Sequence, residues 1–129
     1  MSENFIVEII SPDNSVLKSE SSEVTIPSYE GQMGILKDHI SLITFLRPGL
    51  ITIKENSGEK IFFIEDGTVE FSNNSLLILT STAKNLDNLD KNSLDVIIKN
   101  SEEKISKDGL SDKERYLLSY KIDILKEIS

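Results

Sequence analysis

The chain is predicted to be mostly β followed by α, with an antiparallel β-sandwich over residues 1–84 and an antiparallel two-helix hairpin over residues 85–129. Two observations support this prediction. Up to Ser81 the apolar residues form short runs separated by turn-forming residues, as is typical of all-β domains. After Lys84 glycine and proline almost disappear, and the apolar spacing changes to three and four, as in amphipathic helices.

The candidate strands are bounded by turn residues such as Pro48-Gly49 and Asp66-Gly67. Connections this short suit hairpins, whereas parallel pairing needs a long crossover, so we expect two packed antiparallel sheets. Gly31 and Gly34 are interpreted as a turn between strands, where a positive φ or a close backbone approach is needed. The strands are predicted at Phe5–Ile10, Val24–Ile26, Leu50–Ile53, Ile61–Ile64, Thr68–Phe71 and Leu76–Leu79.

Both helices have recognisable ends. Asp90 or Asn92 is placed to cap the first helix, and Asp108-Gly109 to end it. Ser111, with Glu114 three residues later, has the spacing of a capping box at the start of the second. Because the connection is short, the helices should lie antiparallel, each burying its apolar face against the other and against a further surface. These faces comprise Leu94, Ile97, Ile98 and Ile105 on the first helix, and Leu117, Leu118, Ile124, Leu125 and Ile128 on the second.

Composition excludes several functional classes. The net charge of −8 disfavours nucleic acid and anionic lipid as partners. Without cysteine the chain has no disulfide, no thiolate metal site and no cysteine nucleophile. The longest apolar stretch, Leu76–Leu79, is too short to cross a bilayer, and the start of the chain lacks the pattern of a signal peptide. We therefore expect no nucleic acid partner and no direct membrane insertion.

The residues also argue against enzymatic chemistry. His39 is the only histidine, so a two-histidine metal site is impossible, and no nucleophile accompanies it. No spacing marks a catalytic carboxylate pair. Gly31 and Gly34 lack the Lys-Ser/Thr ending of a phosphate-binding loop, and no helical pattern follows them. We expect no catalytic residue, no metal and no cofactor.

The stretch EGQMGILKDHISLITFLRPGLI, residues 30–51, resembles the signature region of the epsilon subunit of F-type (proton-translocating) ATP synthases. The shared elements are the spaced glycines, the histidine, the run through Thr44 and Leu46, and Pro48-Gly49 before a strand. Similar turns and strands at Asp66–Phe71 and Thr82-Ala83 extend the resemblance to nearly the whole chain. It implies the same order of sandwich and helical hairpin.

This resemblance implies a non-catalytic rotor component at the cytoplasmic face of the bacterial inner membrane. Its sandwich would bind the gamma subunit and the c-ring and couple proton-driven rotation to ATP synthesis. The hairpin would reach the alpha/beta catalytic head when extended and restrain ATP hydrolysis. By position, Glu30, Gln32 and His39 would face the c-ring or its junction with gamma, and Ser11 and Thr44 would contact gamma. The family often has an acidic residue at the position of Gln32. A carboxylate there could form a charge-assisted hydrogen bond to an arginine of the c-ring, whereas the Gln32 amide could form only a weaker, neutral one.

Some relatives bind ATP through a Leu/Ile-Asp-x-x-Arg-Ala motif at the first helix. Leu89 and Asp90 match it, but Ser93 and Leu94 occupy the arginine and alanine positions, so no nucleotide site is expected. Fold alone does not determine function. A free-standing β-sandwich adaptor or ligand-binding module therefore stays as the alternative, with a small hydrolase as a third possibility.

Overall fold

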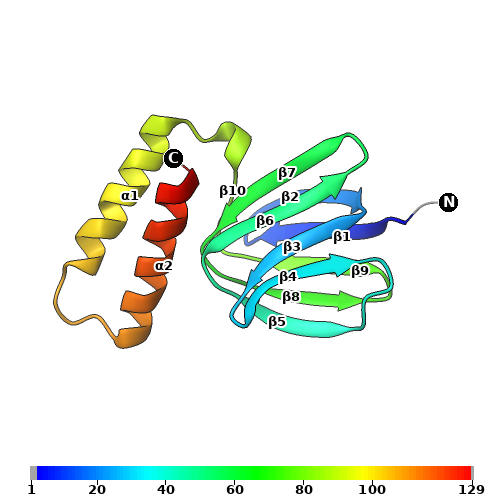
Figure 1. Ribbon diagram of the computed structural model, residues 1–129, viewed down its shortest axis with the longest axis horizontal. Coiled ribbons are helices and arrows are strands. Elements are labelled where there is room, and N and C mark those ends of the chain that lie inside the picture. The colour runs from blue at the N-terminus through cyan, green and yellow to red at the C-terminus, as the bar shows by residue number, and fades with distance from the viewer. Residues whose placement is uncertain (1–2, 129) are drawn as a thin grey trace. The chain divides into compact units, whose positions relative to one another are not determined.

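The structure, a computed structural model, describes residues 3–128 (Figure 1). The chain divides into two compact units, residues 1–86 and residues 87–129. The described part of the first unit is built from strands, and that of the second is mainly a pair of helices. The predicted fold class, a β-sandwich followed by a helical hairpin, is confirmed.

The strands form a hydrogen-bonded series in the order β10-β7-β6-β3-β5-β8-β9-β1-β2, and β4 pairs with β3. The link between β3 and β5 is the single pair Ser28–Leu46, and there the series folds over into two layers (Figure 1). Within residues 3–128 the strands are β1 (Phe5–Ser11), β2 (Asn14–Ser21), β3 (Glu23–Ser28), β4 (Gly31–Leu36), β5 (Leu42–Leu46), β6 (Gly49–Glu55), β7 (Gly58–Ile64), β8 (Gly67–Ser72), β9 (Ser75–Leu79) and β10 (Ala83–Asn85).

Alternating burial places one side of β1, β6, β8 and β9 in the core, whereas β7 ends in three consecutive buried residues, Phe62–Ile64. On β1, for example, Phe5, Val7 and Ile9 are almost fully buried, because successive side chains of a strand point to opposite faces. The same alternation recurs on both layers, so the core forms between them. It contains Phe5, Val7, Ile9, Val24, Ile26, Ile35, Leu46, Ile51, Ile53, Phe62, Ile64, Val69, Phe71, Leu76 and Ile78.

Three features of the sandwich differ from the prediction. Strands β2, β4, β5 and β10 were not predicted. Pairing between β1 and β9 is parallel, so the expectation of purely antiparallel sheets is wrong at this pair. Parallel pairing is possible because the intervening strands supply a long crossover. Gly31 has a φ of 127° at the turn, as predicted, whereas Gly34 lies inside β4 without a positive φ, so its assignment to a turn is wrong.

The hairpin consists of α1 (Lys91–Ile105) and α2 (Asp112–Ile128), preceded by a short 3₁₀ turn at Leu86–Asn88. Asp90 caps α1, as one of the two predicted candidates, by accepting a 2.7 Å hydrogen bond from the Ser93 amide. The predicted capping box of α2 is confirmed, since Glu114 N donates to Ser111 Oγ and Ser111 N donates to Glu114 Oε1.

Helix α1 ends at Ile105, three residues before the predicted Asp108-Gly109. Arg115 of α2 explains how this end is stabilised, because its guanidinium donates to the carbonyls of Ile105 at 3.0 Å and Lys107 at 3.3 Å. A cation at a helix C-terminus satisfies unpaired carbonyls and opposes the helix dipole.

The buried side chains of the hairpin are Leu94, Ile98 and Ser101 on α1 and Ile122 and Leu125 on α2. Ile122 was missing from the predicted apolar face, while Leu94, Ile98 and Leu125 belonged to it. Ser101 donates to the Ile97 carbonyl at 2.9 Å, which satisfies its buried hydroxyl within its own helix. Within residues 3–128, neither helix combines the length and apolar character needed to cross a bilayer.

Candidate functional site

The side of β5, β8, β9 and β1 that points away from the core is here called the outer face. Strand register aligns Phe45 of β5, Thr68 of β8, Leu79 of β9 and Ile10 of β1 in one row across it. Paired residues of neighbouring strands project to the same side of a sheet. The outer face therefore carries a row of three large apolar side chains and one threonine.

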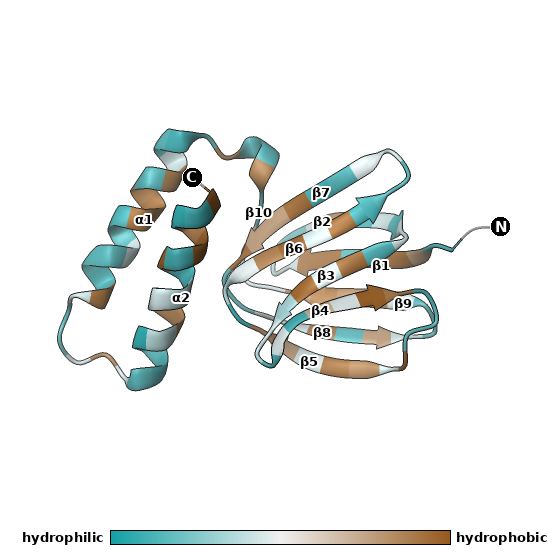
Figure 2. Ribbon diagram, viewed as in Figure 1, coloured by the Kyte–Doolittle hydropathy of each residue, from teal (hydrophilic) through white to brown (hydrophobic). Residues whose placement is uncertain are grey.

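Exposure distinguishes this face from an ordinary protein surface. Ile43, Phe45 and Leu79 are 75%, 61% and 44% exposed. Ile43 and Phe45 lie two residues apart on β5, so they project to the same side, and apolar residues occupy most of this strand (Figure 2). Scattered exposed apolar residues need no explanation, but a contiguous group of them marks an interaction surface.

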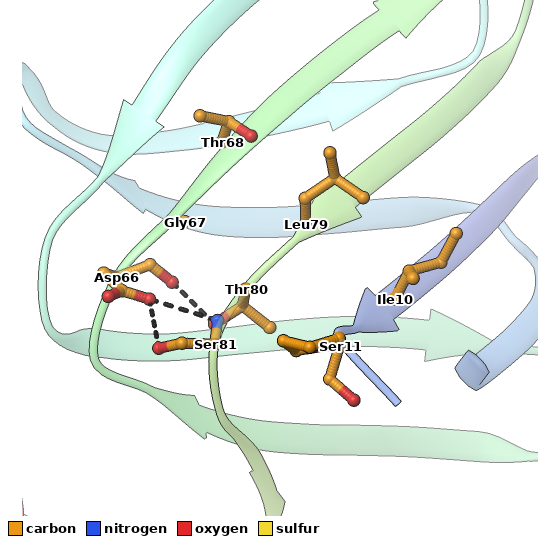
Figure 3. A pocket seen from close by; sticks show the side chains of 9 residues that line it. Ile10, Ser11, Asp66, Gly67, Thr68, Leu79, Thr80 and Ser81 are labelled. Carbon is orange, nitrogen blue, oxygen red and sulfur yellow. Dashed lines mark hydrogen bonds between the residues drawn. The ribbon is translucent and has the colours of Figure 1, made fainter. Parts of the chain in front are cut away.

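An open pocket of about 570 Å³ lies where β1 and β9 end and β8 begins (Figure 3). Ile10 and Leu79 of the row also line this pocket, so it is continuous with the outer face. The remaining lining residues are Ser11, Pro12, Asp66, Gly67, Thr68, Thr80 and Ser81.

Local hydrogen bonds hold the pocket in shape. Ser81 Oγ donates to Asp66 Oδ1 at 2.7 Å, and the Ser81 amide donates to the same oxygen at 3.2 Å (Figure 3). The buried Thr80 hydroxyl lies 2.6 Å from the Asp66 carbonyl oxygen. Gly67 has a φ of 156°, and a Cβ there would lie 2.5 Å from the Leu79 carbonyl oxygen. Only glycine permits this close approach between β8 and the end of β9.

Three of the predicted contact residues lie toward the pocket end of the sandwich. Ser11 lines the pocket itself. Glu30 is exposed in the turn between β3 and β4, and the preceding Tyr29 amide donates to the Phe45 carbonyl, which brings this turn to the same end of β5. Gln32 follows on β4 with an exposed side chain.

The other two predicted residues lie elsewhere. His39 is in the loop between β4 and β5, at the opposite end of β4 from Glu30. Thr44 pairs with the buried Val69, so its side chain is on the core side of β5, away from the outer face. The structure thus brings Ser11 to the pocket and separates His39 from Glu30 and Gln32 by most of the length of a strand.

The arrangement suits packing better than catalysis. Asp66 accepts hydrogen bonds from Ser81, and the pocket contains neither a histidine nor a second carboxylate to act with it. Among residues 3–128, no three histidine or carboxylate side chains converge as a metal site would require. The site offers apolar surface with a few hydroxyl groups.

Asp90 and Ser93, at the positions of the family's nucleotide motif, serve the helix start instead. The Ser93 amide donates to the Asp90 carboxylate, and this hydrogen bond lowers the pKa of Asp90 from its ordinary value of 3.8. Leu94, at the alanine position, is buried in the hairpin. The aspartate therefore caps α1, and Ser93 supplies no guanidinium for a phosphate.

Sequence reasoning missed the outer face and its pocket. A usable signal was present in Leu42-Ile43-Thr44-Phe45-Leu46, because a strand with one side in solvent should alternate apolar and polar residues. In this strand Ile43 and Phe45 are apolar although they project away from the core. The pocket had no comparable signal, since its residues come from three separate strand ends.

Residues 4–86 match the family model described as ATP synthase, Delta/Epsilon chain, beta-sandwich domain. Over their full lengths, the chain is 45% identical to the ATP synthase epsilon chain of Pelagibacter ubique (strain HTCC1062). It is 31% identical to ATP synthase epsilon chain 2 of Nitrobacter hamburgensis, over 84% of this chain and 79% of that one. The chain belongs to the ATP synthase epsilon chain family.

Solved structures agree on the fold. In the cryo-EM structure of the Euglena gracilis mitochondrial ATP synthase, one chain superposes with a TM-score of 0.76 at 21% identity, covering 98% of this chain and 79% of that one. A chain of the Tetrahymena thermophila mitochondrial ATP synthase, from its central stalk and c-ring, gives 0.65 at 16% identity, covering 95% and 93%. As a member of the epsilon family, the chain is a non-catalytic subunit.

Proposed function

We propose that this subunit belongs to the central stalk of a rotary ATP synthase and couples c-ring rotation to ATP synthesis in the catalytic head. Its outer face is the surface that binds the gamma subunit. The observation that supports this assignment is the row of Phe45, Leu79 and Ile10, continuous with the Ser11 pocket. Such a face gains free energy when a partner removes it from water.

Glu30, Gln32 and His39 are proposed to contact the c-ring or its junction with gamma, and Ser11 and Thr44 to contact gamma. Because Glu30 and His39 lie at opposite ends of β4, they reach the rotor at separate points. Thr44 projects toward the core side of β5, so we assign it an indirect contribution through the shape of that strand.

The hairpin is proposed to reach the alpha/beta catalytic head when extended. A depression of about 330 Å³ near its turn supports this, since Leu117 and Leu118 line it together with Lys104 and Lys107. We expect only modest restraint of ATP hydrolysis, because basic and acidic residues on α2 nearly balance and Arg115 is already engaged by α1 carbonyls. Long-range attraction to an acidic partner is correspondingly weak.

The complex would hold this subunit peripherally at the cytoplasmic face of the bacterial inner membrane. The full-length match to epsilon chains supports a subunit role and not the alternative of a free-standing adaptor. Affinity purification of the tagged full-length chain from detergent-solubilised membranes tests the assignment. Co-purification of alpha, beta, gamma and c subunits is expected, whereas recovery of an unrelated partner alone would overturn it.

A further inference from the structure

Two loops at the end of the sandwich opposite the pocket are joined by reciprocal hydrogen bonds. The Asp38 amide donates to Asn74 Oδ1 at 2.7 Å, and Asn74 Nδ2 donates to Asp38 Oδ1 at 2.9 Å. Asp38 lies between β4 and β5, and Asn74 lies in the turn between β8 and β9. We call this pair the Asp38–Asn74 clasp.

Backbone geometry makes both residues suited to this contact. Asp38 and Asn74 have φ values of 66° and 57°, in the left-handed region. Aspartate and asparagine tolerate this region better than other residues with side chains. The Asn74 carbonyl also accepts from the Ile6 amide at 3.1 Å, which ties the β8–β9 turn to β1. The clasp therefore connects the β4–β5 loop to an anchored turn.

His39 follows Asp38 directly, and its position depends on that loop. Its amide donates to the Leu36 carbonyl at 3.1 Å, and its Nδ1 lies 2.7 Å from the Ile40 carbonyl oxygen. The imidazole meets the Phe71 ring edge to face, with centroids 5.9 Å apart and planes at 87°. Phe71 belongs to the core, so it gives the imidazole a fixed surface.

We propose that Asn74 is a positioning residue for His39, acting through the clasp to hold the imidazole against Phe71. This inference depends on the proposed function in one respect, namely that His39 contacts another rotor subunit. Asn74 itself is not among the residues proposed to touch a partner, and it lies at the turn of the β8–β9 hairpin, at the opposite end from Leu79.

Exchanging the two side chains tests the clasp. Asn74→Asp places two carboxylates together and removes the amide donor, so the clasp should break. Asp38→Asn keeps an acceptor for Asn74 Nδ2 and should change little. The double variant D38N/N74D restores one amide and one carboxylate. Asn73→Asp is the matched control, since Asn73 is in the same turn, with a φ of 50°, and takes the same charge.

The readout is the NMR spectrum of the full-length chain. In N74D we expect the His39 ring protons to lose the shift caused by the Phe71 ring current, and the Asp38 amide to exchange about tenfold faster. The double variant should return both signals to the wild-type values, and N73D should leave them unchanged. Unchanged signals in N74D, equal changes in N73D, or a folded double variant without recovery would each overturn the clasp.

Co-purification of the same variants with the ATP synthase separates this inference from the proposed function. If N74D weakens recovery of gamma and c subunits and D38N/N74D restores it, both stand. If the NMR result is as expected while N74D and His39→Ala both assemble normally, the clasp is supported and the rotor contact of His39 is overturned.

Discussion

Phe45→Thr should weaken binding of the gamma subunit without unfolding the sandwich. Phe45 is 61% exposed in the chain, so most of its apolar surface is available to a partner. Threonine is β-branched and, like phenylalanine, is favoured in strands, which limits the effect of the substitution on β5 itself. The change therefore acts mainly on the outer face.

The expected magnitude follows from this exposure. Complete burial of a phenylalanine side chain is worth about 1.5–3 kcal/mol, so burying the 61% that remains exposed contributes about 1–2 kcal/mol. Since about 1.4 kcal/mol corresponds to a tenfold change in affinity, the dissociation constant should rise about 5- to 30-fold. The free energy of unfolding of the isolated chain should change by no more than about 1 kcal/mol, through the lost Phe45–Thr68 pair.

The assay is calorimetric titration of the purified chain with the gamma subunit, alongside thermal melting of the chain alone. Leu36→Thr is the matched control, because Leu36 is 54% exposed but lies on β4, which is not part of the outer face. Equal affinity of the wild type and Phe45→Thr would refute the assignment of the outer face. So would an equal loss in Leu36→Thr, because the effect would then not be specific to that face.

Three further outcomes are expected. A chain truncated after Leu86, which keeps β10, should fold alone with a cooperative melt by circular dichroism; a truncated chain without such a melt would contradict an independent sandwich core. His39→Glu should reduce co-purification of gamma and c subunits, because it leaves a charge without a partner at a packed junction, and normal assembly would remove His39 from the interface. The Asp90 cap should contribute helix stability fully above the ordinary pKa of 3.8 and lose it as pH falls through the lowered pKa of the folded state, so the Ser93 amide signal should move in that acid range in the wild type but not in Asp90→Asn.

Local signals predicted the parts of the fold that depend on neighbouring residues. Ser111 and Glu114 form the expected capping box because both groups lie within one helical turn. The six predicted strands have apolar runs that the core requires on at least one side. In these cases the residues that determine a local structure lie within a few positions of it in the sequence.

Other features depend on distant residues and could not be read in the same way. The glycines of β4 made that strand resemble a turn, although Gly34 has no neighbour within 4 Å of a Cβ and simply lies on an open strand. Parallel pairing of β1 with β9 joins segments separated by most of the sandwich. Ser11 was proposed as a contact residue through the family resemblance, but only the meeting of β1, β8 and β9 reveals the pocket around it.

The two sides of β5 should respond differently to substitution. Leu46 is 1% exposed and belongs to the core, so truncating it to alanine should cost about 2–5 kcal/mol of folding free energy. Phe45, its neighbour, projects to the opposite side and contributes little to that core. Adjacent residues of this strand therefore separate folding from binding: loss of Leu46 lowers the melting temperature, while loss of Phe45 lowers affinity for the partner. Because the core is complete without Phe45 and Ile43, their exposed apolar surface is best explained by a partner that covers it.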